Sequence, residues 1–234
     1  MLQLGTTTVI EGIYHRIKKI SHLSDLVIAT SDTGKDDAFV NFCKEKQLNV
    51  FRGSENDVLA RYYEAAMQYE ADLVIRITGD CPLIDPQECE KVIDRLLSTG
   101  ADYVSNVDPP TYPDGYDTEV FTFAALKKAY EMTNKASDRE HVTLFIRENP
   151  DIFQTDNVAL TEDFSHLRLT LDESDDYKLL QNIFGYLEQN QCFGNLREVV
   201  TLLQENPELS SVNSHICRNE GLEKSIQNDQ VKQK

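Results

Sequence analysis

The sequence is short of positive charge. Its 234 residues contain 23 lysines and arginines against 40 aspartates and glutamates, which gives a formal net charge of −17. A nucleic-acid-binding surface needs a basic stripe, and an acidic protein repels the phosphate backbone instead. We therefore expect no nucleic-acid partner. A small anionic ligand remains compatible with this charge if a metal ion or a local group of arginines reverses the field in one cleft.

The sequence also lacks paired cysteines and long apolar runs. Its five cysteines are odd in number and scattered, and no C-x-x-C pair indicates a zinc or redox site. Reduced thiols in a cytoplasmic protein are the simplest interpretation. The N-terminal stretch carries its positive charge after its apolar residues and is too polar to span a bilayer. We therefore predict no signal peptide and no membrane partner.

What the sequence does contain is a regular alternation of two patterns. Short apolar segments at 25–30, 49–51, 72–77 and 102–105 alternate with amphipathic segments at 8–20, 36–46, 55–69 and 86–100. Alternating strands and helices favour right-handed crossovers and a sheet covered by helices on both faces. We predict an α/β fold of the doubly wound class with a mostly parallel sheet.

The second half is less regular. The proline-rich segment 107–115 predicts a loop, because proline removes hydrogen-bond donors from a central strand. Beyond it we predict a strand at 119–122, helices at 124–133 and 138–148, a strand at 167–171, and helices at 175–189 and 196–205. Ser137 and Glu140 have the spacing of a capping box for the second of these helices. We expect one domain at 1–212, followed by a polar, frayed tail at 213–234.

Two aspartates follow predicted strands directly. Asp80 comes after the segment LVIRITG, and Asp172 comes after LRLTL. Ligands of open α/β sheets bind at the carboxyl ends of the strands, and magnesium takes one or two protein carboxylates. We interpret Asp80 and Asp172 as a magnesium site, with Gly79 letting the chain turn close to the ligand. The alternative is that either aspartate is a helix cap or turn residue.

Six motifs occur in the order found in one known family. They are VIATS (27–31), VFRGSENDVLARYYEAA (50–66), VIRITGDCPLID (74–85), YPDGYDTEVF (112–121), SDREHVT (137–143) and LRLTLDESDDYKLL (167–180). Together they extend from about residue 4 to about residue 212, and an ordered set is far more specific than one motif. The chain resembles the cytidylyltransferases that activate acidic sugars as CMP derivatives, and is most similar to their spore coat polysaccharide (SpsF-like) branch.

The resemblance implies a nucleotidyl transfer for surface polysaccharide synthesis. A hydroxyl of an acidic sugar would attack the α-phosphate of CTP, and pyrophosphate would leave. Such chemistry depends on positioning and charge neutralisation. By the match to the motifs, Asp80 and Asp172 would hold Mg²⁺, and Arg76 would lie beside them as a third catalytic residue.

The resemblance also implies residues for the two substrates. For the nucleotide these are Arg52, Ser54, Asp57 and Arg61. Asp57 and Arg61, four residues apart on a predicted helix, could alternatively form a surface ion pair. For the sugar they are Asp117, Glu119, Arg139 and His141. Asp117 and Glu119 alternate along an extended segment and so point to one side, whereas a lone histidine near a helix start is more often structural than catalytic.

The chain departs from the family at its beginning. Members open with an apolar strand and a loop carrying an arginine and a lysine that wraps the triphosphate, and Thr7 stands where the lysine is expected. We expect that roughly twenty residues, a central strand and its loop, precede the matching region in the family. Three interpretations stay open: a longer active enzyme, a non-catalytic nucleotide- or sugar-binding module, and a subunit that pairs with another, a homodimer being the family's expectation. A glycosyltransferase is a fourth alternative, although Asp80-Cys81-Pro82 lacks its D-x-D pair.

Overall fold

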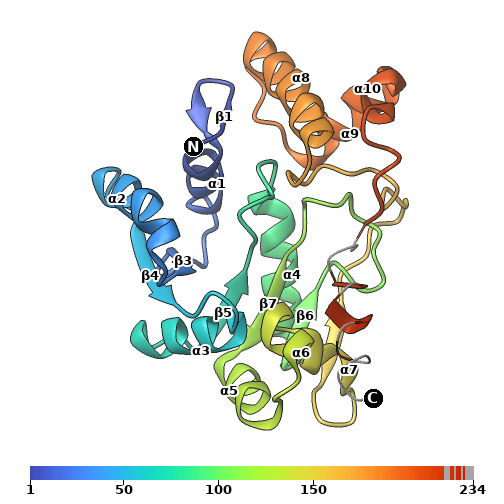
Figure 1. Ribbon diagram of the computed structural model, residues 1–234. Helices are drawn as coiled ribbons and strands as arrows, with labels where there is room; N and C mark the ends of the chain where they lie inside the picture. Colours follow the sequence, from blue (N-terminus) through green and yellow to red (C-terminus); the bar gives the residue numbers. More distant parts are fainter. Residues whose placement is uncertain (219–221, 224, 228, 230–234) are drawn as a thin grey trace.

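The computed structural model describes residues 1–218, 222, 223, 225–227 and 229, and Figure 1 traces them along the chain. Within these residues no helix is both long and apolar enough to cross a membrane. The first half consists of β1 (Gln3–Leu4), β2 (Thr7–Thr8), α1 (Val9–Ile17), β3 (Val27–Ser31), the short helix η1 (Gly34–Asp36), α2 (Asp37–Glu45), β4 (Asn49–Gly53), α3 (Val58–Gln68), β5 (Leu73–Arg76), α4 (Pro86–Thr99) and β6 (Tyr103–Ser105). The predicted alternation of this half is confirmed.

The second half follows the loop 106–118. It contains β7 (Glu119–Thr122), α5 (Phe123–Met132), α6 (Ala136–His141), α7 (Leu144–Glu148), β8 (Thr155–Asn157), α8 (Ser174–Asn190), α9 (Leu196–Glu205) and α10 (Pro207–Ser211). Helices α8 to α10 gather at one end of the molecule and α5 to α7 at the other (Figure 1). The short strands β1, β2 and β8 and the helix α10 were not predicted, because segments of two to five residues carry too little periodicity.

The α/β class is confirmed, but the pairing is more mixed than predicted. Strands β3 and β4 pair in parallel, as do β6 and β8. Strand β7 lies between β5 and β6 and runs antiparallel to both. The order of the larger sheet is therefore β5-β7-β6-β8. Of the described strands, β3 and β5 each pair on one edge, and the expectation of a further central strand stays a prediction.

Helices cover both faces of the larger sheet. Val104 and Val120 pack with α1 and α4 in one core, whereas their chain neighbours Tyr103 and Phe121 pack with α3, α5 and α7 in another. This follows from the alternation of side chains along a strand. The four side chains are at most 2% exposed, so both cores are closed at the sheet.

A third core anchors the loops beyond the strand ends. Leu83, Tyr112 and Tyr116 are buried against α8 and α9. Tyr116 directly precedes Asp117, and Leu83 lies three residues after Asp80. The segments 78–85 and 111–117 are therefore held by apolar packing, although they contain no regular hydrogen-bonded structure.

Two predicted elements differ from the structure. The helix predicted at 138–148 is divided into α6 and α7 by Val142, whose φ is 56° and ψ −61°, with Thr143 donating its N–H to the carbonyl of His141. Lys135 rather than Ser137 occupies the N-cap, so the predicted capping box is wrong. The strand predicted at 167–171 is an extended segment that forms a single parallel bridge, between Arg168 and Asp114.

The predicted frayed tail is also ordered where the structure describes it. Asn213 is 1% exposed and donates hydrogen bonds to the carbonyl of Arg168 and to Asp176. Arg218 donates to the carbonyl of Tyr112. A polar composition misled the prediction, because these side chains bind buried polar groups and not solvent. The rest of the predicted tail beyond 218 lies largely outside the described residues.

Gly115→Ala should destabilise the protein more than Gly100→Ala. Gly115 has a φ of 103°, and a Cβ built there would lie 2.5 Å from the backbone carbonyl of Leu169. Gly100 also has a positive φ, 68°, but open space around its Cβ position. We expect a loss of about 1 kcal/mol for Gly100→Ala, from the left-handed backbone alone, and at least about 2 kcal/mol more for Gly115→Ala. Urea denaturation measures both. Equal losses would show that the loop 111–117 does not depend on close packing against 167–171.

Candidate active site

The loop after β5 brings Asp80 to the extended segment that precedes α8. The carbonyl of Asp80 accepts a hydrogen bond of 2.9 Å from the N–H of Leu171 and one of 3.3 Å from the hydroxyl of Thr170. Asp172 follows directly. Burial and, second, the negative charge of Asp80 raise the pKa of Asp172. The structure thus brings together the two aspartates that the sequence singled out.

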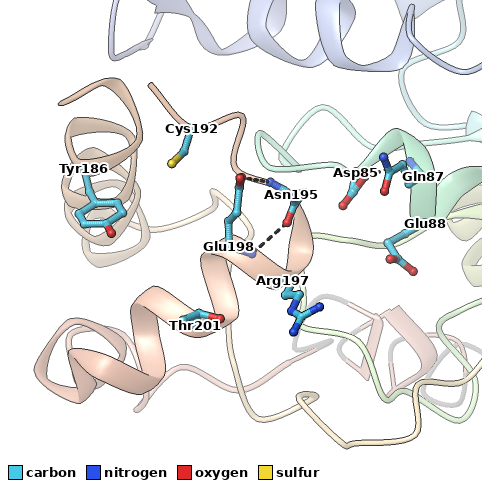
Figure 2. Close-up of a pocket in the computed structure, with 9 residues that line it drawn as sticks. All are labelled: Asp85, Gln87, Glu88, Tyr186, Cys192, Asn195, Arg197, Glu198 and Thr201. Atoms are coloured by element: carbon cyan, nitrogen blue, oxygen red, sulfur yellow. Dashed lines mark hydrogen bonds between the residues drawn. The ribbon is translucent and has the colours of Figure 1, made fainter. Parts of the chain in front are cut away.

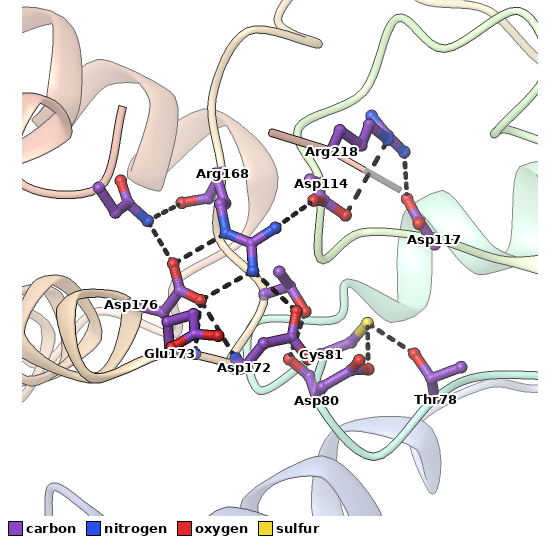
Figure 3. Close-up of polar contacts among 12 residues, drawn as sticks. Thr78, Asp80, Cys81, Asp114, Asp117, Arg168, Asp172, Glu173, Asp176 and Arg218 are labelled. Carbon is purple, nitrogen blue, oxygen red and sulfur yellow. Dashed lines mark hydrogen bonds and ion pairs between the residues drawn. The ribbon is translucent and has the colours of Figure 1, made fainter. Parts of the chain in front are cut away.

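Arg168 holds the acidic residues of this region. Its Nε and Nη2 donate to the two oxygens of Asp176, both at 2.9 Å, and Nη2 also donates to Asp172 at 2.8 Å. Its Nη1 reaches Asp114 at 3.2 Å (Figure 3). Burial opposes the negative charge of Asp176, but hydrogen bonds from Arg168, Asn213 and two backbone N–H groups lower its pKa. Sequence reasoning missed Arg168, Asp114 and Asp176.

A second arginine, Arg218, offsets the negative charge of the loop that contains Asp114 and Asp117. Arg218 donates to Asp117 at 2.7 Å and lies 4.0 Å from Asp114 (Figure 3). Burial raises the pKa of Asp117 to about 7, although Arg218 lowers it. Burial likewise raises the pKa of Asp114. No pattern in the sequence indicates Arg218, since it comes about a hundred positions later in a segment of low complexity.

The cluster carries excess negative charge. Five carboxylates, those of Asp80, Asp114, Asp117, Asp172 and Asp176, face the guanidinium groups of Arg168 and Arg218. A divalent cation would offset that excess. In the described part of the chain no three or more His, Cys, Asp or Glu side chains are arranged to hold a metal by themselves. Any cation here would thus take its remaining ligands from water or from a substrate.

Gly79 and Cys81 flank Asp80 differently. A Cβ at Gly79 would meet no atom within 4 Å, and its φ is not in the left-handed region, so the fold does not require glycine there. Cys81 is buried beside Thr78, 3.2 Å away, and burial followed by the charge of Asp80 raises the pKa of its thiol well above the usual value. Cys81 is therefore a neutral, packed thiol. The chain does turn at residues 79–80, as expected, but the turn does not require glycine, so space for a ligand is the remaining reason for it.

The four residues expected at the nucleotide lie between the end of β4 and the start of α3. Asp57 is the N-cap of α3 and accepts from the N–H of Ala60 at 2.9 Å, while Ser54 accepts from the N–H of Asp57. Arg61 donates to the carbonyl of Ser54 at 2.8 Å, and its buried Nε has no partner. The alternative ion pair between Asp57 and Arg61 does not form among the described contacts. Arg52 bonds the carbonyls of Ser31 and Thr33, and its Nη1 lies 2.8 Å from Asp37.

The residues expected at the sugar separate into two groups. Glu119 pairs with Arg76 at 2.9 Å, and both lie close to His141, whose pKa burial lowers. Arg139 instead bonds the carbonyls of Thr133 and Tyr130 and lies 3.4 Å from Asp57. Its guanidinium is thus committed to the fold. A sugar-binding role for Arg139 stays a prediction, and a ligand would have to compete with these contacts.

A separate cavity lies between the start of α4 and the helices α8 and α9. It has a volume of about 550 Å³ and is lined by Asp85, Gln87, Glu88, Tyr186, Cys192, Asn195, Arg197, Glu198 and Thr201 (Figure 2). Its carboxylates already have partners. Asp85 caps α4 and accepts from the N–H of Leu196, Glu88 accepts from Tyr112 and Lys91, and Glu198 forms a capping box with Asn195. The cavity contains none of the acidic cluster around Asp80.

Comparison with known proteins decides the family. The profile of the cytidylyltransferase family matches residues 1–211. The chain belongs to the cytidylyltransferase family. The resemblance found in the sequence motifs is therefore confirmed, and the matched region contains both Asp80 and Asp172.

Several relatives cover nearly the whole cytidylyltransferase chain. An uncharacterized protein of Methanocaldococcus jannaschii is 37% identical, with 92% of this chain and 88% of that protein aligned. The spore coat polysaccharide biosynthesis protein SpsF of Bacillus subtilis is 28% identical, over 89% of this chain and 88% of its own length. A solved cytidylyltransferase of Leptospira borgpetersenii is 29% identical and superimposes with a TM-score of 0.84, over 89% of this chain and 88% of that one.

More distant cytidylyltransferase structures share the fold. The CMP:2-keto-3-deoxy-manno-octonic acid synthetase, solved with CTP, has a TM-score of 0.55 and 15% identity, with 81% of this chain and 91% of that chain covered. At that identity the likeness supports the nucleotidyltransferase fold alone. The predicted fold class is therefore supported both by the elements of this chain and by its structural relatives.

Asp117→Asn should flatten the dependence of stability on pH between about 5 and 8. The pKa of Asp117 is about 7 in the fold and about 4 in an unfolded chain. The native state therefore binds more protons in this window, and stability falls as the pH rises. Because the side chain is 28% exposed, we expect a difference of about 1 kcal/mol across the window. Urea unfolding at both pH values measures it, and parallel pH profiles for the two proteins would contradict this assignment.

Proposed function

We propose that this protein transfers the cytidylyl group of CTP to a hydroxyl of an acidic sugar, giving a CMP-sugar and pyrophosphate. The observation that carries the proposal is the convergence of Asp80 and Asp172 in a chain of the cytidylyltransferase family. A role in surface or spore coat polysaccharide synthesis is supported by the likeness to SpsF. Under this proposal the protein works in the cytoplasm, where CTP is made, and a homodimer stays a prediction.

Magnesium suits the residues at the proposed centre. Asp80 and Asp172 repel one another, since the charge of the first raises the pKa of the second, and a divalent cation between them would relieve this repulsion. Two carboxylates completed by water and phosphate oxygens are a usual environment for Mg²⁺. The ion would supply charge neutralisation at the phosphates.

The side chains of the protein supply positioning. Arg168 holds Asp172 at 2.8 Å and so fixes the orientation of its carboxylate. The buried Nε of Arg61 is a donor without a partner at the end of β4, where the nucleotide is proposed to lie. Arg76 is fixed by Glu119 and carries its charge close to Asp80. Burial alone would lower the pKa of Arg76, but Glu119, with smaller contributions that include Asp80, raises it. Fixed charges and dipoles of this kind stabilise developing charge without reorganisation.

The other interpretations of the sequence have less support. A glycosyltransferase is disfavoured by membership of the cytidylyltransferase family. A non-catalytic binding module or a partner subunit would keep the same acidic cluster but would not release pyrophosphate. Measurement of CTP binding and of pyrophosphate release therefore separates these interpretations.

Asp80→Asn should weaken magnesium-dependent CTP binding by at least tenfold, because it removes one of two proposed carboxylate ligands. Asp25→Asn is the matched control, since Asp25 precedes the strand β3 instead of following a strand. Calorimetric titration with CTP, with and without magnesium, measures the effect, with UTP and ATP run in parallel. If both substitutions weaken CTP binding equally, Asp80 is not a magnesium ligand. Absence of CTP binding by the folded protein would contradict the proposed function.

Gly79→Ala should leave stability unchanged within about 0.5 kcal/mol and still weaken CTP binding. The Cβ of alanine would enter open space in the ligand-free protein, so the fold tolerates it. A phosphate that approaches the backbone at this point would collide with the methyl group. Thermal unfolding and CTP titration of the same variant give the two readouts. Unchanged CTP affinity would show that the ligand does not contact the chain at Gly79.

A further inference from the structure

A row of polar side chains crosses the larger sheet at one register. Arg76 of β5 lies opposite Glu119 of β7, and Glu119 lies opposite Ser105 of β6. Two residues further along, the same face carries Val74, Phe121 and Tyr103, which are apolar or aromatic. The polar row therefore marks the place where the apolar core under α3, α5 and α7 ends and the ligand-binding end of the sheet begins.

The connection between α6 and α7 lies over this row. His141 ends α6, and Arg147 lies within α7. Burial raises the pKa of Tyr103, and the positive charge of Arg147 partly opposes that rise. In His141, burial and the charge of Arg147 both lower the pKa. Between the two helices Val142 adopts a φ of 56° in a tight turn closed by Thr143. A β-branched residue in this conformation is strained, and strain of this kind concentrates where ligands bind.

Polar atoms of this group are buried without hydrogen-bond partners, although Glu140 lies 3.9 Å from His141. They are the Nε of Arg76, the hydroxyl of Tyr103, one carboxylate oxygen of Glu119, the Nε2 of His141 and the Nε of Arg147. The residues Tyr103 and Glu119 are only 2% and 6% exposed. Leaving one such atom unpaired costs about 1–3 kcal/mol. Five such atoms lie close together and include both donors and acceptors. A polar ligand that forms hydrogen bonds with them explains this arrangement best.

Arg147 differs from the other arginines of the chain. Its guanidinium forms no hydrogen bond or ion pair in the described part of the chain, and only Arg197 shares that property. Arg197, however, is exposed to solvent. Arg147 is partly buried and has no counter-ion, a state that favours the binding of an anion. It therefore offers its charge more readily than Arg139, which is already committed to the fold.

We propose that the guanidinium of Arg147 binds the negatively charged group of the acceptor sugar, while Glu119 and Tyr103, on the sheet, bind the hydroxyls of the acceptor. The proposal rests on the proposed function for the identity of the acceptor as a carboxylated sugar. A polyhydroxylated acid has both the donors that Glu119 and His141 require and the acceptors that Arg76, Tyr103 and Arg147 require. A neutral polyol would leave the guanidinium of Arg147 unpaired. Arg147 is thus proposed as the residue that selects acidic acceptors.

Direct binding of sugars tests the proposal without any turnover. The probes are an eight-carbon ulosonic acid, a nine-carbon ulosonic acid and a hexuronic acid, each compared with its uncharged methyl ester by calorimetric titration of the full chain with magnesium. We expect at least one acid to bind tighter than its ester by roughly 10- to 100-fold, the usual size of a charge-assisted hydrogen bond. Arg147→Gln should reduce this preference to about onefold, and Arg147→Lys should retain part of it.

Arg197→Gln is the matched control, because it removes the other unpaired guanidinium and should leave the preference unchanged. CTP titration of each variant shows whether the nucleotide site is intact. Where an acid is turned over, Arg147→Gln should raise its KM much more than it lowers kcat. Retention of the acid preference by Arg147→Gln would overturn the proposal, as would equal binding, or no binding, of acids and esters by the wild type. CTP binding is measured separately, so failure of the proposal on Arg147 can be distinguished from failure of the proposed cytidylyl transfer.

Discussion

The arrangement of the site depends on one buried guanidinium. Arg168 has a side chain only 10% exposed and is shared by Asp114, Asp172 and Asp176, which come from a loop, an extended segment and the start of α8. Asp176 itself is fully buried and accepts from the backbone of residues 172 and 173. Removing one partner of such a network leaves an uncompensated charge away from water, which commonly costs 3–5 kcal/mol. Arg168 and Asp176 therefore fix the position of Asp172.

The remaining arginines divide into those that build the fold and those that keep donors available. Arg16 is buried and bonds the carbonyls of Ile84, Gly194 and Phe193, so it is structural. Arg139 is committed in the same manner. Arg61, Arg76 and Arg147 instead retain buried donors without partners, and they lie along the ends of β4 and β5 and over the sheet. In a chain with a net charge of −17, these donors are the buried positive groups that the proposed binding of an anionic substrate depends on.

The sequence predicted most of the longer helices and strands, and it singled out Asp80 and Asp172, for identifiable reasons. Amphipathic spacing and caps such as Asp85 and Gly100 define α4 almost to the residue, and Asp80 and Asp172 follow apolar segments. The rest of the site depends on contacts between distant parts of the chain. Arg168 stands inside an apolar motif, and Arg218 lies in a polar segment, so neither has a local pattern that separates it from a solvent-exposed arginine. The break at Val142 was missed because SDREHVTLFIRE has continuous helical character, and only the tertiary fold stabilises a positive φ at valine.

The direction of β7 determines which segments of the chain contribute side chains to one rim of the larger sheet. Because β7 runs against β5 and β6, its first residues lie at the same rim as the last residues of its neighbours. Asp117 and Glu119 precede or begin a strand, whereas Arg76 and Ser105 end theirs, and yet all four belong to one rim. A chain made only of parallel strands could supply that rim only from segments that follow strands. One reversed strand lets the long loop before it, residues 106–118, contribute side chains to the rim as well.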